Sequence, residues 1–199
     1  EHGVICSFPT DFYGYFGWPT VARMDDGQLV VAASGLRNAH VCPFGSVEMM
    51  RSRDGGLTWS FPRTLMDSPI DDRDSGVLET AKGTILITTF TSLAYEPILG
   101  RAERDGNWPT ERLARWRAAH HRVDAAGRLA ALGVWMIRST DGGVTFQRVP
   151  LDGDYPGTST NASDNCGLPT GTYFTGTDLE VQSLQDRLTV NFSFKTFHR

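Results

Sequence analysis

Four consecutive charged residues, Asp71-Asp72-Arg73-Asp74, form the run in this chain that is best suited to proton transfer. Adjacent carboxylates raise one another's pKa and a neighbouring arginine lowers it, so one carboxyl group can remain an acid while another is a base. Asp72 and Asp74 are therefore candidate catalytic residues, and Arg73 is a candidate for binding an anionic or hydroxyl group. The alternative is a solvated loop in which Arg73 only holds its own neighbours in place.

An eight-residue pattern, Ser-x-Asp-Gly-Gly-x-Thr-aromatic, occurs at 52–59 and again at 139–146. Glycine adopts positive φ at little cost and aspartate accepts bonds from nearby backbone N–H groups, so the pattern predicts a tight hairpin turn. Serine and threonine add local bonds, and the aromatic side chain packs beneath the turn. No substrate is required, so we interpret both copies as structural. The residues with this role are Ser52, Asp54, Gly56, Thr58, Trp59, Ser139, Asp141, Gly143, Thr145 and Phe146.

Short apolar segments separated by turn residues predict antiparallel strands around both patterns. The first unit is expected to have strands at 18–24, 28–34, 47–51 and 61–65, with a hairpin at Asp25-Asp26-Gly27. Similar strands follow at 76–80 and 84–90. Repeated units of four short strands are typical of propeller blades. We therefore expect an irregular arm at 1–16, blades at 17–67 and 74–150, and a fainter third blade at 157–199.

The second unit contains an insertion. Gly83 follows Gly27 by 56 positions, whereas Asp141 follows Asp54 by 87, which leaves 31 additional residues between the second and third strands. The insertion spans 98–131, and its Ala- and Arg-rich part near 109–125 predicts a helix. Its arginines either line an anionic cleft or form a solvated helix face.

The repeated pattern resembles the Asp-box, or BNR repeat, of the sialidase (neuraminidase) superfamily and related β-propeller proteins. The resemblance covers roughly residues 15–150 and implies an all-β fold, with about three blades of a six-bladed ring present in this chain. Blades that do not complete a ring leave open edges, which favour self-association. The resemblance carries little information on activity, because Asp-boxes also occur in propellers that only bind or assemble.

The segment 17–32 is similar to the opening blade of bacterial sialidases, in which three arginines grip the substrate carboxylate. The first of these arginines falls at Gly17 and is absent. The second corresponds to Arg37, offset by one residue. The acid/base aspartate of the family has no counterpart after Arg37, but His40 has an unperturbed pKa near neutrality and could transfer a proton instead. A structural hydrogen-bonding role for His40 is the alternative.

Composition excludes several classes of protein. The chain has 199 residues and a formal net charge of -4, which argues against a general nucleic-acid binder. No apolar run approaches the roughly 18 residues of a membrane span. Three widely spaced cysteines predict neither a metal site nor a disulfide framework, and no cofactor is implied. The sequence as given contains no signal peptide, which leaves secreted and cytoplasmic locations open.

Three functions are consistent with these features. The first is a sialidase-like exo-glycoside hydrolase that acts on a terminal, possibly acidic, sugar of a glycan. Its catalytic residues would come from Asp72, Asp74 and His40, and its substrate ligands would be Arg37 and Arg73. The second is a non-catalytic Asp-box propeller that binds glycans or a protein partner. The third is a structural assembly factor.

Overall fold

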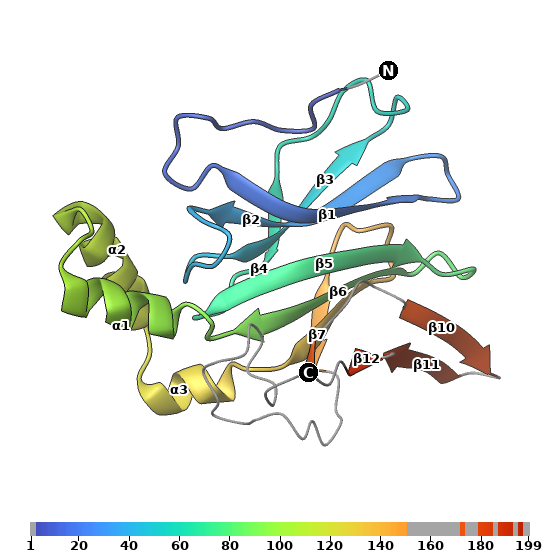
Figure 1. Ribbon diagram of the computed structural model, residues 1–199. Helices are drawn as coiled ribbons and strands as arrows, with labels where there is room; N and C mark the ends of the chain where they lie inside the picture. The colour runs from blue at the N-terminus through green and yellow to red at the C-terminus, as the bar shows by residue number, and fades with distance from the viewer. Residues whose placement is uncertain (1–2, 151–171, 174–178, 185–186, 193–194, 197–199) are drawn as a thin grey trace.

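The structure, a computed structural model, describes residues 3–150 and the segments 172–173, 179–184, 187–192 and 195–196 (Figure 1). Residues 3–150 form eight strands and three short helices. The strands are β1 (Tyr15–Arg23), β2 (Leu29–Arg37), β3 (Ser46–Ser52), β4 (Arg63–Met66), β5 (Asp71–Glu79), β6 (Ile85–Ser92), β7 (Val134–Ser139) and β8 (Gln147–Pro150). The helices are α1 (Glu96–Asp105), α2 (Thr110–His120) and α3 (Ala125–Ala130).

The strands form two four-stranded antiparallel sheets in which neighbours along the chain are neighbours in space. The orders are β1-β2-β3-β4 and β5-β6-β7-β8. Figure 1 shows them as two layers, with the three helices at the end where β2 finishes and β5 begins. Within residues 3–150 neither sheet closes on itself. The fold is therefore mostly β, as expected, with two of the predicted four-stranded units present.

Alternating side chains of the two sheets form one shared apolar core. β2 contributes Val30 and Ala32, β3 contributes Val47 and Met49, and β6 and β7 contribute Ile85, Ile87 and Ile137. Each fully buried side chain of this size stabilises the fold by roughly 1.5–3 kcal/mol relative to exposure. The period-two pattern of the sequence thus places one face of each sheet against the other.

Polar bonds also join β5 to the first sheet. The Ser34 hydroxyl donates to the carbonyl of Asp72 at 2.6 Å, and the Thr20 hydroxyl donates to that of Ser75 at 2.7 Å. At the far end of β5, the Glu79 carboxylate accepts a bond from the backbone N–H of Asp25 at 2.6 Å. The two layers are therefore tied together along the length of β5.

Both eight-residue patterns fold into the same hydrogen-bonded turn. In the first, the Ser52 hydroxyl donates to Asp54 at 2.7 Å, and Asp54 accepts from the Thr58 backbone N–H and hydroxyl at 2.9 and 2.5 Å. In the second, Asp141 accepts the corresponding bonds from Ser139 and Thr145 at 2.8, 2.9 and 2.5 Å. These bonds lower the pKa of both aspartates, with the threonine hydroxyl as the largest cause.

The second turn differs from the first in one respect, because the first sheet holds it. Arg51 donates to the carbonyl of Gly142 at 2.8 Å, and Arg63 donates to those of Gly143 and Val144 at 2.9 Å each. Gly143 has a φ of 80°, which favours glycine, and a Cβ atom there would lie 1.6 Å from the Arg51 guanidinium, so a larger residue would have to displace that side chain. The two sheets are consequently joined at their turn end by arginine side chains.

The opposite face of the first sheet is covered by the N-terminal segment. Val31, Ala33 and Met50 are buried on this face, with Ile5 and Phe16 packed against them. Residues 3–14 are irregular, and the first strand begins at Tyr15, slightly before the expected boundary.

The insertion between β6 and β7 contains three helices rather than the single predicted one. α2 lies within the range where the sequence predicted a helix, whereas α1 begins earlier, with Pro97 in its first turn and Gly106 at its left-handed C-cap. The Asp124 side chain caps α3. A second apolar cluster, which includes Ile70, Tyr95, Leu99 and Trp116, packs the helices beside the sheets.

Two further expectations from the sequence concern where the second unit begins and whether a third blade follows it. The run Asp71-Asp72-Arg73-Asp74 was expected to precede a strand, but it is the beginning of β5, and Asp71 and Asp72 are fully buried. The expected third blade lies largely outside the described residues, which show there only the pairs β10 (Leu179–Leu184) with β11 (Arg187–Phe192) and β9 (Thr172–Tyr173) with β12 (Lys195–Thr196).

Among the described helices, none has the length and apolarity needed to cross a membrane.

Candidate functional site

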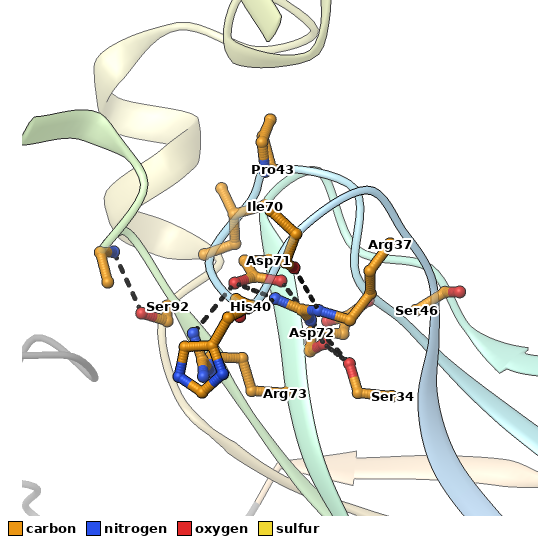
Figure 2. A network of polar contacts seen from close by, with 12 residues as sticks. Ser34, Arg37, His40, Pro43, Ser46, Ile70, Asp71, Asp72, Arg73 and Ser92 are labelled. Atoms are coloured by element: carbon orange, nitrogen blue, oxygen red, sulfur yellow. Dashed lines mark hydrogen bonds and ion pairs between the residues drawn. The ribbon is translucent and has the colours of Figure 1, made fainter. Parts of the chain in front are cut away.

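The candidate site lies where β2 ends and β5 begins, next to the β2–β3 loop at 38–45. Figure 2 shows Arg37 and Asp71 pointing toward each other, with Asp72, Arg73 and His40 around them. Two of the sequence-predicted residues come from the β2 side, Arg37 and His40, and three come from β5, Asp72, Arg73 and Asp74. The two sheets therefore bring together residues that are more than 30 positions apart in the chain.

Arg37 is fully buried, and its five guanidinium N–H groups have five acceptors. Nε donates to Ala39 O at 3.3 Å, Nη1 to Ser34 Oγ at 2.7 Å and Asp72 O at 3.1 Å, and Nη2 to His40 O at 3.0 Å and Asp71 Oδ2 at 2.9 Å. Nη1 also lies 2.7 Å from Asp71 Oδ1 in an ion pair. Burial alone would lower the pKa of Arg37, but the Asp71 carboxylate outweighs it and raises that pKa. Arg37 is thus a fixed cation that holds the β2–β3 loop against β5.

Asp71 lies between two arginines. Besides its contacts with Arg37, its Oδ2 is 3.5 Å from Nη1 of Arg73, and both side chains are almost inaccessible to solvent. Gly45 makes this packing possible, because a Cβ atom there would lie 2.2 Å from Arg37 Nη1 and 2.3 Å from Asp71 Oδ1. A buried ion pair is stable only when further hydrogen bonds satisfy its remaining groups, and the loop carbonyls do so for Arg37.

Asp72 is buried on the opposite side of β5. Its Oδ2 accepts a bond from the Ser68 backbone N–H at 2.7 Å, and its Oδ1 is buried without a hydrogen-bond partner in the described part of the chain. Burial raises the pKa of Asp72 to about 7, although the bonds from Ser68 oppose the shift. This carboxyl group is therefore partly protonated at neutral pH.

Asp74 is the half-buried carboxyl group of the site. Burial raises its pKa, and the positive charges of Arg73 and Arg37 partly offset this rise. Its Oδ1 atom is buried and, among residues 3–150, has no hydrogen-bond partner. Burial without a hydrogen-bond donor disfavours the charged form of a carboxyl group, because that form loses more hydration than the neutral form.

His40 and Trp18 form the aromatic side of the site. His40 is exposed, and its ring centroid lies 4.9 Å from that of Trp18. Partial burial lowers the pKa of His40, and the charges of Arg73 and Arg37 lower it further. The guanidinium carbons of Arg73 and Arg37 lie 4.6 and 5.1 Å from the Trp18 ring centroid. Trp18 has a φ of 50°, which is strained for a bulky residue and marks the irregular part of β1.

The sequence analysis did not identify several residues that build this site. Trp18, Ser34, Gly45, Ser68 and Asp71 all contact its charged groups. Asp71 belongs to the run that was singled out, but nothing local shows that it, rather than Asp72 or Asp74, pairs with Arg37. The signal available for Trp18 was its place in the sequence. It directly follows Gly17, where the resemblance puts the first arginine of the family's triad.

Another buried carboxyl group, that of Glu48, lies outside this site. Its Oε1 accepts bonds from the hydroxyls of Ser46 and Thr64 at 2.8 Å each, and burial raises its pKa. The Ser46 bond lies within β3 and the Thr64 bond joins β3 to β4, and neither gives a sign of a ligand. Among the described residues, no group of three or more His, Cys, Asp or Glu is arranged to hold a metal ion.

Comparisons with known proteins provide only distant likenesses. No family model and no curated protein matches the chain. A protein of unknown function from Dyadobacter fermentans has a TM-score of 0.46 and 23% identity over 74% of this chain and 38% of its own. The Hadza microbial sialidase Hz136 has a TM-score of 0.47 and 17% identity over 68% of this chain and 25% of its own. The chain thus spans well under half the length of either protein, and these likenesses assign no activity to it.

Proposed function

We propose that this protein is a sialidase-like exo-glycoside hydrolase, and that its two sheets are neighbouring blades of a β-propeller with the site at their inner end. The observation that carries the proposal is the state of Asp74. It is half-buried, has a raised pKa, and has a buried Oδ1 with no hydrogen-bond partner among residues 3–150, and the charge of the exposed His40 acts on it. Hydrolysis of a glycosidic bond needs such an acid together with a base.

The pKa shifts of the two groups have the directions that a general acid and a general base require. Protonated Asp74 donates its proton to the glycosidic oxygen as the bond from that oxygen to the anomeric carbon breaks. Neutral His40, whose pKa is lowered, accepts a proton from the water molecule that bonds to the anomeric carbon. The proton given up by Asp74 is thereby balanced by the one that His40 receives, and proton exchange with solvent restores both groups.

The remaining residues position this pair. Arg37 holds the loop that carries His40 through the carbonyls of Ala39 and His40. Arg73 lies between Asp71 and Trp18, next to Asp74 in the chain, and its charge limits the rise of the Asp74 pKa. Asp72 is fully buried, so we assign it a supporting role rather than contact with the sugar.

The test is hydrolysis of a panel of p-nitrophenyl glycosides by the chain and by Asp74→Asn. We expect at least about a hundredfold loss of kcat/KM in Asp74→Asn, since general acids contribute about 10²–10⁴-fold, with an unchanged melting temperature. Asp25→Asn, which changes an exposed aspartate at the other end of the sheets, is the matched control and should keep full activity. Undiminished activity in Asp74→Asn would remove this residue from the mechanism.

A second candidate function, non-catalytic binding of a glycan or protein, is favoured by the burial of Arg37. A residue expected to contact substrate has all its N–H groups bonded within the protein. If no glycoside in the panel is hydrolysed but glycans still bind to the chain, this second function replaces the first.

A further inference from the structure

We propose that Trp18 is a positioning residue of the site. Its indole ring holds the Arg73 guanidinium, so that the positive charge of Arg73 acts on both His40 and Asp74 instead of being neutralised by a carboxylate of its own. This inference rests on the proposed function, because it gives Trp18 a part in preparing the acid and the base. Three observations support it: the partners of the two arginines, the backbone of β1, and the two groups that the charge of Arg73 affects.

The two arginines of the site share a single carboxylate, and Arg37 has the better contact with it. Arg37 Nη1 lies 2.7 Å from Asp71 Oδ1, and its Nη2 donates to Oδ2 at 2.9 Å. Arg73 reaches Asp71 only through Nη1, at 3.5 Å, which is at the outer limit of a hydrogen bond. Its Nε is buried and, in the described part of the chain, has no hydrogen-bond partner. The charge of Arg73 is therefore only partly compensated by Asp71.

Trp18 supplies a second contact of Arg73. The guanidinium carbon of Arg73 lies 4.6 Å from the Trp18 ring centroid, within the range of a cation–π interaction, and that of Arg37 lies 5.1 Å away. Arg73 is 4% exposed, and this interaction is strongest where the cation is dehydrated. An aromatic ring attracts a cation but has no net charge. It therefore fixes the position of Arg73 without cancelling its charge, which a second carboxylate would do.

The backbone of the first sheet is bent where it places this ring. Trp18 has a φ of 50°, and the pairing of β1 with β2 shifts its register on both sides of Gly17. In the described part of the chain, the other non-glycine residue with a positive φ is Leu36, which directly precedes Arg37. Such conformations persist only when surrounding contacts over-determine them, and they cluster at functional sites. At Trp18 these contacts are made by the two arginines and His40.

The charge of Arg73 acts on both members of the proposed acid–base pair. Burial is the main reason why the pKa of His40 is lowered, and Arg73 is the next largest cause, ahead of Arg37, while Asp74 opposes the shift. Burial also raises the pKa of Asp74, and Arg73 is the largest of the causes that oppose this rise. If the ring did not hold it, the Arg73 side chain would extend toward solvent and its charge would be hydrated. The pKa of both His40 and Asp74 would then rise.

The first test is an NMR titration of the His40 ring, which needs no substrate. The chain has five histidines, so the His40 signal is identified by its absence from His40→Gln. We expect Trp18→Leu and Arg73→Gln each to raise the pKa of His40, and Trp18→Phe to raise it less, because phenylalanine still offers a ring to the guanidinium. Trp59→Leu, which changes a tryptophan packed at the turn end, is the matched control and should leave that pKa unchanged. An unchanged pKa of His40 in Trp18→Leu would overturn the proposal.

The combination of Trp18→Leu with Arg73→Gln separates an indirect effect of Trp18 from a direct one. If Trp18 acts through Arg73, the combined variant should have nearly the same His40 pKa as Arg73→Gln alone. Two shifts that add in full would mean that Trp18 acts on His40 by itself, and would reject the positioning role.

Fluorinated tryptophans at position 18 keep the test decisive if Trp18→Leu does not fold. Fluorine atoms weaken the attraction of the ring for cations while nearly preserving its shape. We expect the pKa of His40 to rise stepwise as fluorine atoms are added, because Arg73 is held less firmly. A stepwise fall would mean that the ring stabilises protonated His40 directly, and a constant pKa would mean that the ring does not hold Arg73. Either result would overturn the proposal.

Turnover provides a second measurement, which depends on the proposed function. We expect Trp18→Leu to lower kcat by at least about tenfold with little change in KM, and to move the acidic limb of the pH profile of kcat/KM to higher pH. A raised His40 pKa in a chain that hydrolyses no glycoside would retain the positioning role and reject the enzyme. A lowered kcat with an unmoved His40 pKa would show that Trp18 serves only the fold and would reject the positioning role.

Discussion

The two four-stranded units are closely similar at one end of the paired sheets and differ at the other end. At one end, the turns at 52–59 and 139–146 have the same hydrogen bonds at nearly the same lengths. At the other end, the two units have diverged: the first has a short loop at 38–45, and the second has the three-helix insertion. The repeated end serves the fold of each unit, and the end that does not repeat contains the candidate site.

Aspartates show the same contrast in their chemistry. At the turn end, Asp54 and Asp141 are exposed, and bonds from threonine and serine lower their pKa. At the site end, burial raises the pKa of Asp72 and Asp74. The same side chain is therefore kept ionised where it caps a turn and made easier to protonate where it lies beside the sheet junction.

The largest effect is expected from Asp71→Ala, which leaves the Arg37 guanidinium buried without its carboxylate. Removal of one partner of a buried ion pair costs about 3–5 kcal/mol, and urea unfolding followed by Trp fluorescence measures this cost. Asp67→Ala, which removes the exposed partner of Arg122, is the control and should change the free energy of unfolding by less than about 1 kcal/mol. Similar values for the two variants would show that the Arg37–Asp71 pair does not organise the site end.

A smaller effect should appear in the pH dependence of stability through Asp72. Its folded pKa of about 7 lies above the unfolded value, so between about pH 4 and pH 7 the folded state binds the extra proton. Stability therefore decreases as pH rises through this window and levels off above it.

Asp72→Asn isolates this contribution because the amide does not titrate. We expect the unaltered chain to lose about 2–4 kcal/mol more than Asp72→Asn between pH 4 and pH 7.5, from the free energy equivalent of one pKa unit. Parallel curves for the two proteins, from urea titrations at several pH values, would show that Asp72 does not hold its proton in the folded state.

The smallest effect is expected at the turn end. Asp54→Ala removes the acceptor for Ser52 and Thr58, and its melting temperature should fall by about 2–4 °C without any change in ligand binding at the site. The melting temperature of Asp141→Ala should fall by a similar amount, because the turn at 139–146 has the same hydrogen bonds. A loss of sugar binding in either variant would mean that the two ends are not independent.

The sequence predicted the parts of this structure that depend on local chemistry. The paired glycines and aspartates of the turns, and the alternating apolar residues of β2 and β6, indicated two antiparallel units, because each signal lies within a few residues of its effect. The Ala- and Arg-rich segment likewise indicated α2. The earlier helix α1, with Gly100 inside it, had a weaker local signal.

The site could be predicted only in part, because its geometry depends on contacts between segments distant in sequence. Four charged residues in a row were interpreted as catalytic and binding candidates that precede a strand, with a solvated loop as the alternative. Asp71 and Asp72 are instead buried within β5, because Arg37 and Ser34 of another strand contact them. The position of Trp18 depends on the irregular pairing of β1 with β2, which its neighbours in sequence do not reveal. The proton-transfer roles of Asp72, Asp74 and His40, and the ligand roles of Arg37 and Arg73, remain predictions.

The arginine contacts at the two ends have a consequence for how the protein opens. Arg37 joins the sheets at one end, and Arg51 and Arg63 join them at the other, with the shared apolar core between. Neither sheet can separate from the other without breaking both sets of contacts. The slowly exchanging amide hydrogens of β2 and β6 should therefore become exposed in one concerted event, as members of a single cooperative folding unit.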